Sequence, residues 1–372
     1  MSGAARVADA LWVRLPALAG RASTLLATVL ADGAYLRAWP LAAIAAPAAA
    51  FLAGAVLGRI HPEETFTGAL WVMGPLVVLA GLSAGLGLWA WLGYVLVDFF
   101  VFPHDTFLLE PLLGRAGLIP TYLLLAMLVV VAPLTVQTLV RSSLPRARAR
   151  VTAGLRTPLA VVLGCVLSAI VVYAWTQTAP ILVRPAYTWV GDLPTNDAIQ
   201  PVQATGWFLV FLAAVMGVVR PILQQVAEGR GGTSRLTVHR LGRRGLWPVG
   251  VVVQPALTVL LLAGALEGWL DAVFVWVALA GVLLARQLLA GRLAGYARLA
   301  AHVPILLRAA VAVAASYVIG QEILGLAYPA VSSFRPVLFS ALVSLVVFTV
   351  LLPEWARRRR RAAAAPAGSP AR

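Results

Sequence analysis

Residues 68–102, GALWVMGPLVVLAGLSAGLGLWAWLGYVLVDFFVF, form a nearly uninterrupted apolar run. A transmembrane helix needs about 20 residues to cross the hydrocarbon core, so this run is too long for one crossing. Its centre, 81–87, is rich in glycine, which favours a turn. We therefore predict two membrane-spanning helices, 68–83 and 86–102, joined by a tight hairpin.

The composition of the whole chain is that of a membrane protein. Apolar residues make up 61% of the 372 residues and charged residues 12%, against roughly 45–50% and 25% in soluble domains. The mean hydropathy is +0.90. These values exclude a soluble enzyme, a disordered chain and a disulfide scaffold. All 29 basic residues are arginine, and together with the abundant Ala, Gly and Leu this indicates GC-rich coding. We expect the plasma membrane of a high-GC bacterium.

The same reasoning along the chain predicts an all-α, polytopic integral membrane protein with about ten transmembrane helices. The expected spans are about 38–58, 68–83, 86–102, 119–140, 157–179, 206–219, 246–265, 269–285, 303–326 and 331–352. Residues 1–37 are expected to form an amphipathic cytoplasmic segment lying on the membrane surface. The helical bundle occupies 38–352, and 353–372 form a basic cytoplasmic tail.

The distribution of arginine supports this topology. With ten spans and both termini in the cytoplasm, 24 of the 29 arginines lie on the cytoplasmic side. The others are Arg59, Arg115 and Arg184 outside, and Arg308 and Arg335 within spans. Such a bias is the positive-inside rule. A single span over 68–102 would place the first 37 residues and the basic linker 141–156 on opposite sides, so the hairpin interpretation is favoured.

Polar residues within the expected spans are the candidates for a substrate or ion path, because charges in a membrane usually face a cavity or a partner. The candidate residues are Asp98, Gln254, Glu322, Arg335 and Arg308. Gln254 precedes Pro255, where a broken helix could expose backbone groups to a substrate. Static ion pairing, with Glu322 and Arg335 as the favoured pair, or interfacial anchoring is the alternative for the charged residues. Interhelical hydrogen bonding is the alternative for Gln254.

Catalytic chemistry has little support in the sequence. Gly81, Ser83 and Gly85 match the G-x-S-x-G nucleophile motif, but that motif requires a strand before the turn and a partnering histidine. We predict instead that Gly81 and Gly85, like Gly54 and Gly58, permit close helix packing. We assign no catalytic residue.

Metal and cofactor sites are not expected. The chain has one cysteine, Cys165, which excludes an intramolecular disulfide and a cysteine-based metal site. The four histidines lie outside the apolar cores, which argues against a membrane haem with two histidine ligands. We predict no cofactor and no metal.

Two surface features suggest partners. The segment 180–205 is expected to be an acidic and aromatic exterior loop, serving as a lid or docking surface or as a membrane-surface linker. The basic loops 220–245 and 286–302 should attract anionic lipid on the cytoplasmic side. The tail adds the cluster Arg357, Arg358, Arg359, Arg360 and Arg361. A soluble cytoplasmic partner or a homo-oligomer is left open, and nucleic acid is not expected.

Three function classes fit these observations. A transporter or permease-like component for a small solute is favoured by the number of spans and their polar residues. A non-catalytic membrane anchor or assembly subunit that docks a soluble partner is the first alternative. The second alternative is a membrane enzyme acting on lipid-linked substrates through Asp98, His104, Asp105 and Glu110 at the outer face.

Overall fold

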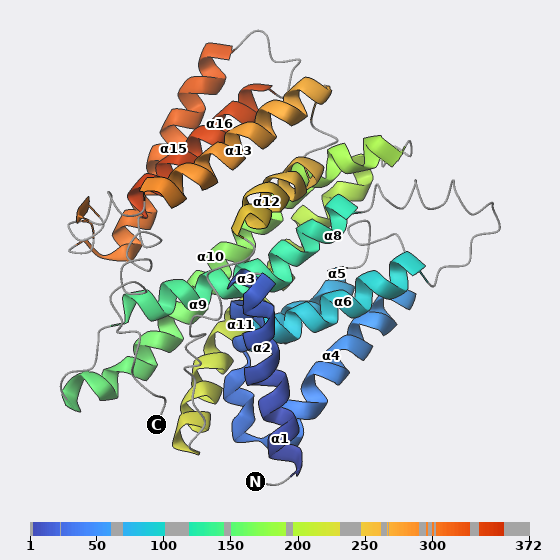
Figure 1. The fold of residues 1–372 in the computed structure, drawn as a ribbon, viewed down its shortest axis with the longest axis vertical. Coiled ribbons are helices and arrows are strands. Elements are labelled where there is room, and N and C mark those ends of the chain that lie inside the picture. Colours follow the sequence, from blue (N-terminus) through green and yellow to red (C-terminus); the bar gives the residue numbers. More distant parts are fainter. Residues whose placement is uncertain are drawn as a thin grey trace. The chain divides into compact units, whose positions relative to one another are not determined.

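The computed structural model describes residues 3–22, 24–60, 70–100, 119–144, 150–190, 196–230, 247–261, 266, 268–289, 295–296, 300, 303–327 and 335–352. Every regular element within these ranges is helical, which confirms the all-α class (Figure 1). Helices long and apolar enough to cross a membrane are Pro40–Ile60, Thr121–Ser143, Thr157–Ala179, Gly206–Gly229 and Ile305–Ile323. Shorter apolar helices are Met73–Leu82, Ala84–Phe100, Val251–Leu260, Trp269–Ala285 and Leu342–Leu351. Each expected span overlaps one of these helices, and the chain is a multi-pass integral membrane protein.

The chain divides into two compact units. The first contains residues 1–246 and 260–264, and the second contains 247–259 and 265–372. Within the described residues, the buried charged side chains are Asp32, Asp98 and Arg220. All three belong to the first unit, so that unit holds the candidate site.

Helices α4 (Pro40–Ile60) and α6 (Ala84–Phe100) pack closely through glycines. A Cβ atom added to Gly54 would lie 1.8 Å from the carbonyl oxygen of Ala90, and Gly58 approaches the α6 backbone in the same way one turn later. No residue larger than glycine fits at such a distance. The prediction that Gly54 and Gly58 permit close helix packing is confirmed.

The predicted hairpin is confirmed as well. A single residue, Ser83, separates the end of α5 (Leu70–Leu82) from the start of α6. A Cβ atom added to Gly87 of α6 would lie 3.0 Å from Cβ of Ala80 on α5. These positions are two turns apart along the chain and can approach so closely only because the two helices fold back on each other.

Helices α10 (Arg150–Val190) and α11 (Asn196–Gly229) correct two expected loops. The segment 180–205 is helical except for 191–195, which lie outside the described residues. Helix α11 continues through Gly229, so the basic loop expected from Arg220 does not begin at that residue. Both helices extend beyond their apolar segments: the hydropathy falls there, but the backbone remains helical. Composition alone therefore placed the ends of these helices wrongly.

Close approach of the same kind joins α10 to α11. A Cβ atom added to Gly164 would lie 2.4 Å from the carbonyl oxygen of Gly217. Pro221, four residues after Gly217, has no N–H to donate to that carbonyl. The Cα of Gly164 on α10 therefore packs against the Gly217 carbonyl oxygen. Because this oxygen has no N–H donor within its own helix, it can accept a Cα–H···O contact.

The N-terminal segment is helical and packs onto the bundle. It consists of α1 (Gly3–Asp9), a π-helical turn Ala10–Arg14, α2 (Leu15–Ala22), α3 (Thr24–Ala31) and a 3₁₀ turn Ala34–Ala38. Buried Trp12 donates its indole N–H to the carbonyl oxygen of Ala43 at 2.8 Å, a carbonyl that Pro47 leaves without a helical donor. Val7, Leu18 and Leu25 remain exposed. Their apolar face suits a membrane surface, which stays a prediction.

The second unit contains α12 (Trp247–Leu261), α13 (Trp269–Leu289), α15 (Ile305–Ala327) and α16 (Arg335–Leu351). Helix α15 packs along α16, and Trp276 of α13 donates its indole N–H to the carbonyl oxygen of Val252 on α12 at 3.3 Å. Helix α12 passes through Pro255 without interruption. The helix break expected beside Gln254 is therefore wrong, because a proline can be accommodated inside a membrane helix.

Candidate functional site

A buried ion pair lies where the N-terminal segment meets α11. Asp32, in the turn that follows α3, accepts a charged hydrogen bond at 2.6 Å from Nη2 of Arg220 on α11. Their side chains are 2% and 3% exposed, respectively. Removing both charges from water carries a large desolvation penalty, and mutual pairing offsets it only when the geometry is good.

The second oxygen of Asp32 binds the start of α6. Its Oδ2 accepts the backbone N–H of Ala84 at 2.8 Å, while Oγ of Ser83 accepts the backbone N–H of Gly85 at 3.0 Å. These are N-terminal donors that have no partner within the helix. The helix dipole places partial positive charge at the same point and favours the carboxylate.

Ser83 is therefore an N-cap, and its geometry explains the G-x-S-x-G motif without catalysis. The side chain is fully buried. Gly81 and Gly85 are also in tight contacts. A Cβ atom added to Gly81 would lie 2.4 Å from Cβ of Met216, and one added to Gly85 would lie 3.1 Å from the carbonyl oxygen of Val29. The predicted packing role of both glycines is confirmed.

Ser83→Ala is expected to destabilise the protein by about 1 kcal/mol, because the N-cap oxygen of α6 is lost. Thermal unfolding in detergent measures the change. Ser142→Ala is the matched control, since the Ser142 hydroxyl is exposed and bonds only within its own helix, to Thr138. Equal stability of the two variants would contradict the capping role.

Tyr35 completes the hairpin contacts. Its hydroxyl donates to the carbonyl oxygen of Leu82, the last residue of α5, at 2.9 Å. Burial raises the pKa of Tyr35 to about 12, with the Asp32 carboxylate adding to the rise and the Arg220 guanidinium opposing it. The phenol thus remains a donor across the physiological pH range. The N-terminal segment supplies a partner to both sides of the α5–α6 turn.

Two side-chain donors of α11, one of them on Arg220 itself, are unsatisfied. Nε of Arg220 and Nε2 of Gln224 are buried and have no hydrogen-bond partner among the described residues. Arg220 and Gln224 are one turn apart on α11, so both lie on one face of the helix. A buried donor without an acceptor costs about 1–3 kcal/mol, which makes this face a place for an additional acceptor.

The other end of α6 carries a second buried carboxylate. Asp98 is 3% exposed and accepts a hydrogen bond from the hydroxyl of Tyr122 on α8 (Ile119–Ala126). Trp91 holds Tyr122 in place by donating to its backbone carbonyl at 2.8 Å. At 1.5 Å per residue, Asp98 lies roughly 21 Å along the helix axis from Ala84.

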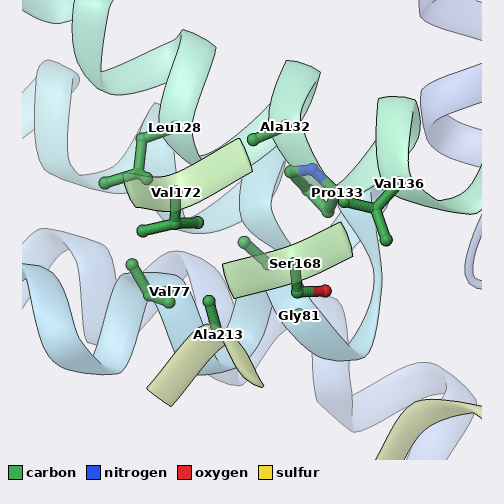
Figure 2. Close-up of a pocket in the computed structure, with 10 residues that line it drawn as sticks. Val77, Gly81, Leu128, Ala132, Pro133, Val136, Ser168, Val172 and Ala213 are labelled. Atoms are coloured by element: carbon green, nitrogen blue, oxygen red, sulfur yellow. The ribbon is translucent and has the colours of Figure 1, made fainter. Parts of the chain in front are cut away.

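A small cavity lies within the first unit. It measures about 30 Å³. Figure 2 shows side chains of several helices converging on it. The lining residues are Val77, Ala80, Gly81, Leu128, Ala132, Pro133, Val136, Ser168, Val172 and Ala213. Ser168 is the polar side chain among them, and the π-helical turn Met127–Val131 adjoins the cavity.

The remaining candidates of the expected path belong to the second unit. Gln254 and Glu322 are exposed there, and half-buried Arg308 donates from Nε to the carbonyl oxygen of Val303 at 3.1 Å. The side chain of Arg335 lies outside the described residues. So do the cluster Arg357–Arg361 and the residues expected at the outer face, His104, Asp105 and Glu110. The contribution of these residues to a path stays a prediction.

The residues that sequence reasoning missed are Asp32 and Arg220. Asp32 lies in a segment expected on the membrane surface, and Arg220 was assigned to the cytoplasmic loop. The local sequence contains no signal for the burial of Arg220, because the following Pro221 favours a helix end or kink at that point.

The all-α fold and its long apolar helices define a multi-pass integral membrane protein. Among the described residues, no group of three or more His, Cys, Asp or Glu side chains is placed to hold a metal ion. No family model, curated protein or solved structure matches the chain.

Proposed function

We propose that this protein is a transporter, or a permease-like component of one, for a small solute in the plasma membrane of a high-GC bacterium. The observation that supports it is that α6, inside an apolar bundle, has a buried ionisable group at each end: Asp98 at one and the Asp32–Arg220 pair at the other. Charged groups within membrane bundles are costly and typically belong to substrate or proton pathways.

The topology in this proposal has about ten spans with both termini in the cytoplasm. The arginine-rich loops and the Arg357–Arg361 cluster then face anionic lipid. Asp98 of the first unit is proposed to line the path, and Gln254, Glu322, Arg308 and Arg335 are the candidates within the second unit. Asp98 is its best-supported member, because Tyr122 beside it is a hydrogen-bond partner through which a proton can pass.

Asp98→Asn is expected to abolish most solute-coupled flux, because the amide cannot take up and release a proton. Proteoliposomes containing the pH-sensitive dye pyranine, challenged with panels of small organic anions, amino acids and sugars, measure this flux. Glu228→Gln is the matched control, since Glu228 is an exposed carboxylate at the end of α11. Full flux in Asp98→Asn would remove Asp98 from the path; Glu322→Gln and Gln254→Ala test those residues in the same way.

A membrane anchor or assembly subunit is the alternative, and the packing of the first unit favours it. Glycine-mediated contacts between its helices leave them little room to separate. Purification from detergent with and without Arg357–Arg361 tests it. A stoichiometric soluble partner that is lost with the cluster, together with absence of flux, would replace the transport proposal.

A further inference from the structure

We propose that the N-terminus of α6 and Arg220 of α11 form a binding site for a small carboxylate anion, and that Asp32 is a built-in ligand occupying it. The site belongs to two helices of the bundle, whereas Asp32 comes from the N-terminal segment outside the expected spans. The idea that this anion is the transported substrate rests on the function proposed above. The binding site itself does not.

The geometry around Asp32 is that of a carboxylate receptor. Each carboxylate oxygen has its own donor: Arg220 at 2.6 Å for Oδ1 and the Ala84 N–H at 2.8 Å for Oδ2. A helix N-terminus with free backbone donors is a general anion site. The guanidinium adds a full positive charge with planar donors that match a carboxylate. Both contributions come from the membrane helices rather than from the segment that carries Asp32.

The guanidinium of Arg220 also has a donor that Asp32 does not use, and Gln224 offers another one turn along α11. Nε of Arg220 and Nε2 of Gln224 are buried without a partner among the described residues. Asp32 is held by its own backbone and cannot satisfy all of these donors at once. A free carboxylate, or one with a further acceptor atom, can shift toward α11 and engage them, which gives an incoming anion contacts that the built-in ligand lacks.

Release of Asp32 requires the N-terminal segment to move. Gly33, the next residue, is packed so tightly that an added Cβ atom would lie 2.2 Å from the ring of Trp12. Trp12 and Tyr35 each hold the segment by a hydrogen bond to a helix carbonyl. The segment therefore acts as a plug over the site, and anion binding competes with closure by the plug.

Formate rescue of Asp32→Ala tests the binding site. The variant removes the carboxylate but keeps the donors, so sodium formate is expected to raise its melting temperature in detergent by a few degrees over equal ionic strength of the bulkier anion gluconate. Asp32→Asn, in which an amide fills the same volume, and Asp32→Ala/Arg220→Gln, which lacks the guanidinium, should show no such rise. Absence of formate stabilisation in Asp32→Ala would overturn the proposal.

Displacement of Asp32 in the intact site is tested separately. Ala34 is 2% exposed, so a cysteine at this position in a Cys165→Ser background should react slowly with a water-soluble thiol reagent. Formate is expected to accelerate labelling several-fold by displacing the plug, and an unchanged rate would refute displacement. This experiment also decides the outcome if Asp32→Ala does not fold. Both measurements are made in detergent, so their failure is distinguishable from an absence of transport.

Discussion

Replacing Arg220 with methionine is expected to destabilise the folded protein by about 3–5 kcal/mol, the usual cost of removing one partner from a buried ion pair. The substitution leaves the Asp32 carboxylate buried with only the N-terminus of α6 to compensate its charge. Thermal or denaturant-induced unfolding in detergent measures the loss. Arg230→Met is the matched control, because Arg230 is exposed and only stacks at 5.3 Å on Trp39; its cost should stay at or below about 1 kcal/mol.

Two double variants separate charge pairing from position. Asp32→Asn/Arg220→Met contains no buried charge, and its amide oxygen can still accept the Ala84 N–H, so it should recover much of the stability lost in Arg220→Met. The exchanged pair Asp32→Arg/Arg220→Asp should recover little, since a guanidinium cannot accept that N–H and is repelled by the positive end of α6. Recovery of stability by the exchanged pair would show that the N-terminus of α6 does not stabilise the carboxylate of Asp32.

The hairpin and the close helix contacts could be predicted from the sequence because they depend on local signals. An apolar run too long for one span and a glycine-rich centre are both visible within 68–102, and the structure places the turn at Ser83. Gly54 and Gly58 are one turn apart on α4, a spacing that itself indicates a packing face. Such features need no knowledge of what lies elsewhere in the chain.

The Asp32–Arg220 pair could not be predicted in the same way, because its members are 188 positions apart. Each taken alone resembles an ordinary residue at the membrane boundary, where charges are common. Their burial results from tertiary packing: the N-terminal segment folds against the bundle, and α11 remains helical beyond the point at which its hydropathy falls. The local composition indicates neither the packing of the N-terminal segment nor the continuation of α11.

Gly54→Ala is expected to destabilise the α4–α6 contact by about 3 kcal/mol or more, the upper range for overpacking. The new Cβ atom would lie 1.8 Å from the Ala90 carbonyl oxygen, which belongs to the backbone and cannot rotate away. On the opposite helix, a Cβ atom added to Gly93 would lie 2.0 Å from the Phe51 carbonyl oxygen, so Gly93→Ala should have a similar effect.

The matched control for both variants is Gly281→Ala on α13, where an added Cβ atom meets nothing within 4 Å. Alanine favours the helix over glycine by roughly 1 kcal/mol, so Gly281→Ala should be neutral or slightly stabilising while the two interface variants lose stability. The difference in melting temperature between them isolates the steric contribution, because all three substitutions add the same methyl group to a helical glycine. Equal melting temperatures would mean that α4 and α6 can separate freely, and that the bundle is looser than the backbone contacts indicate.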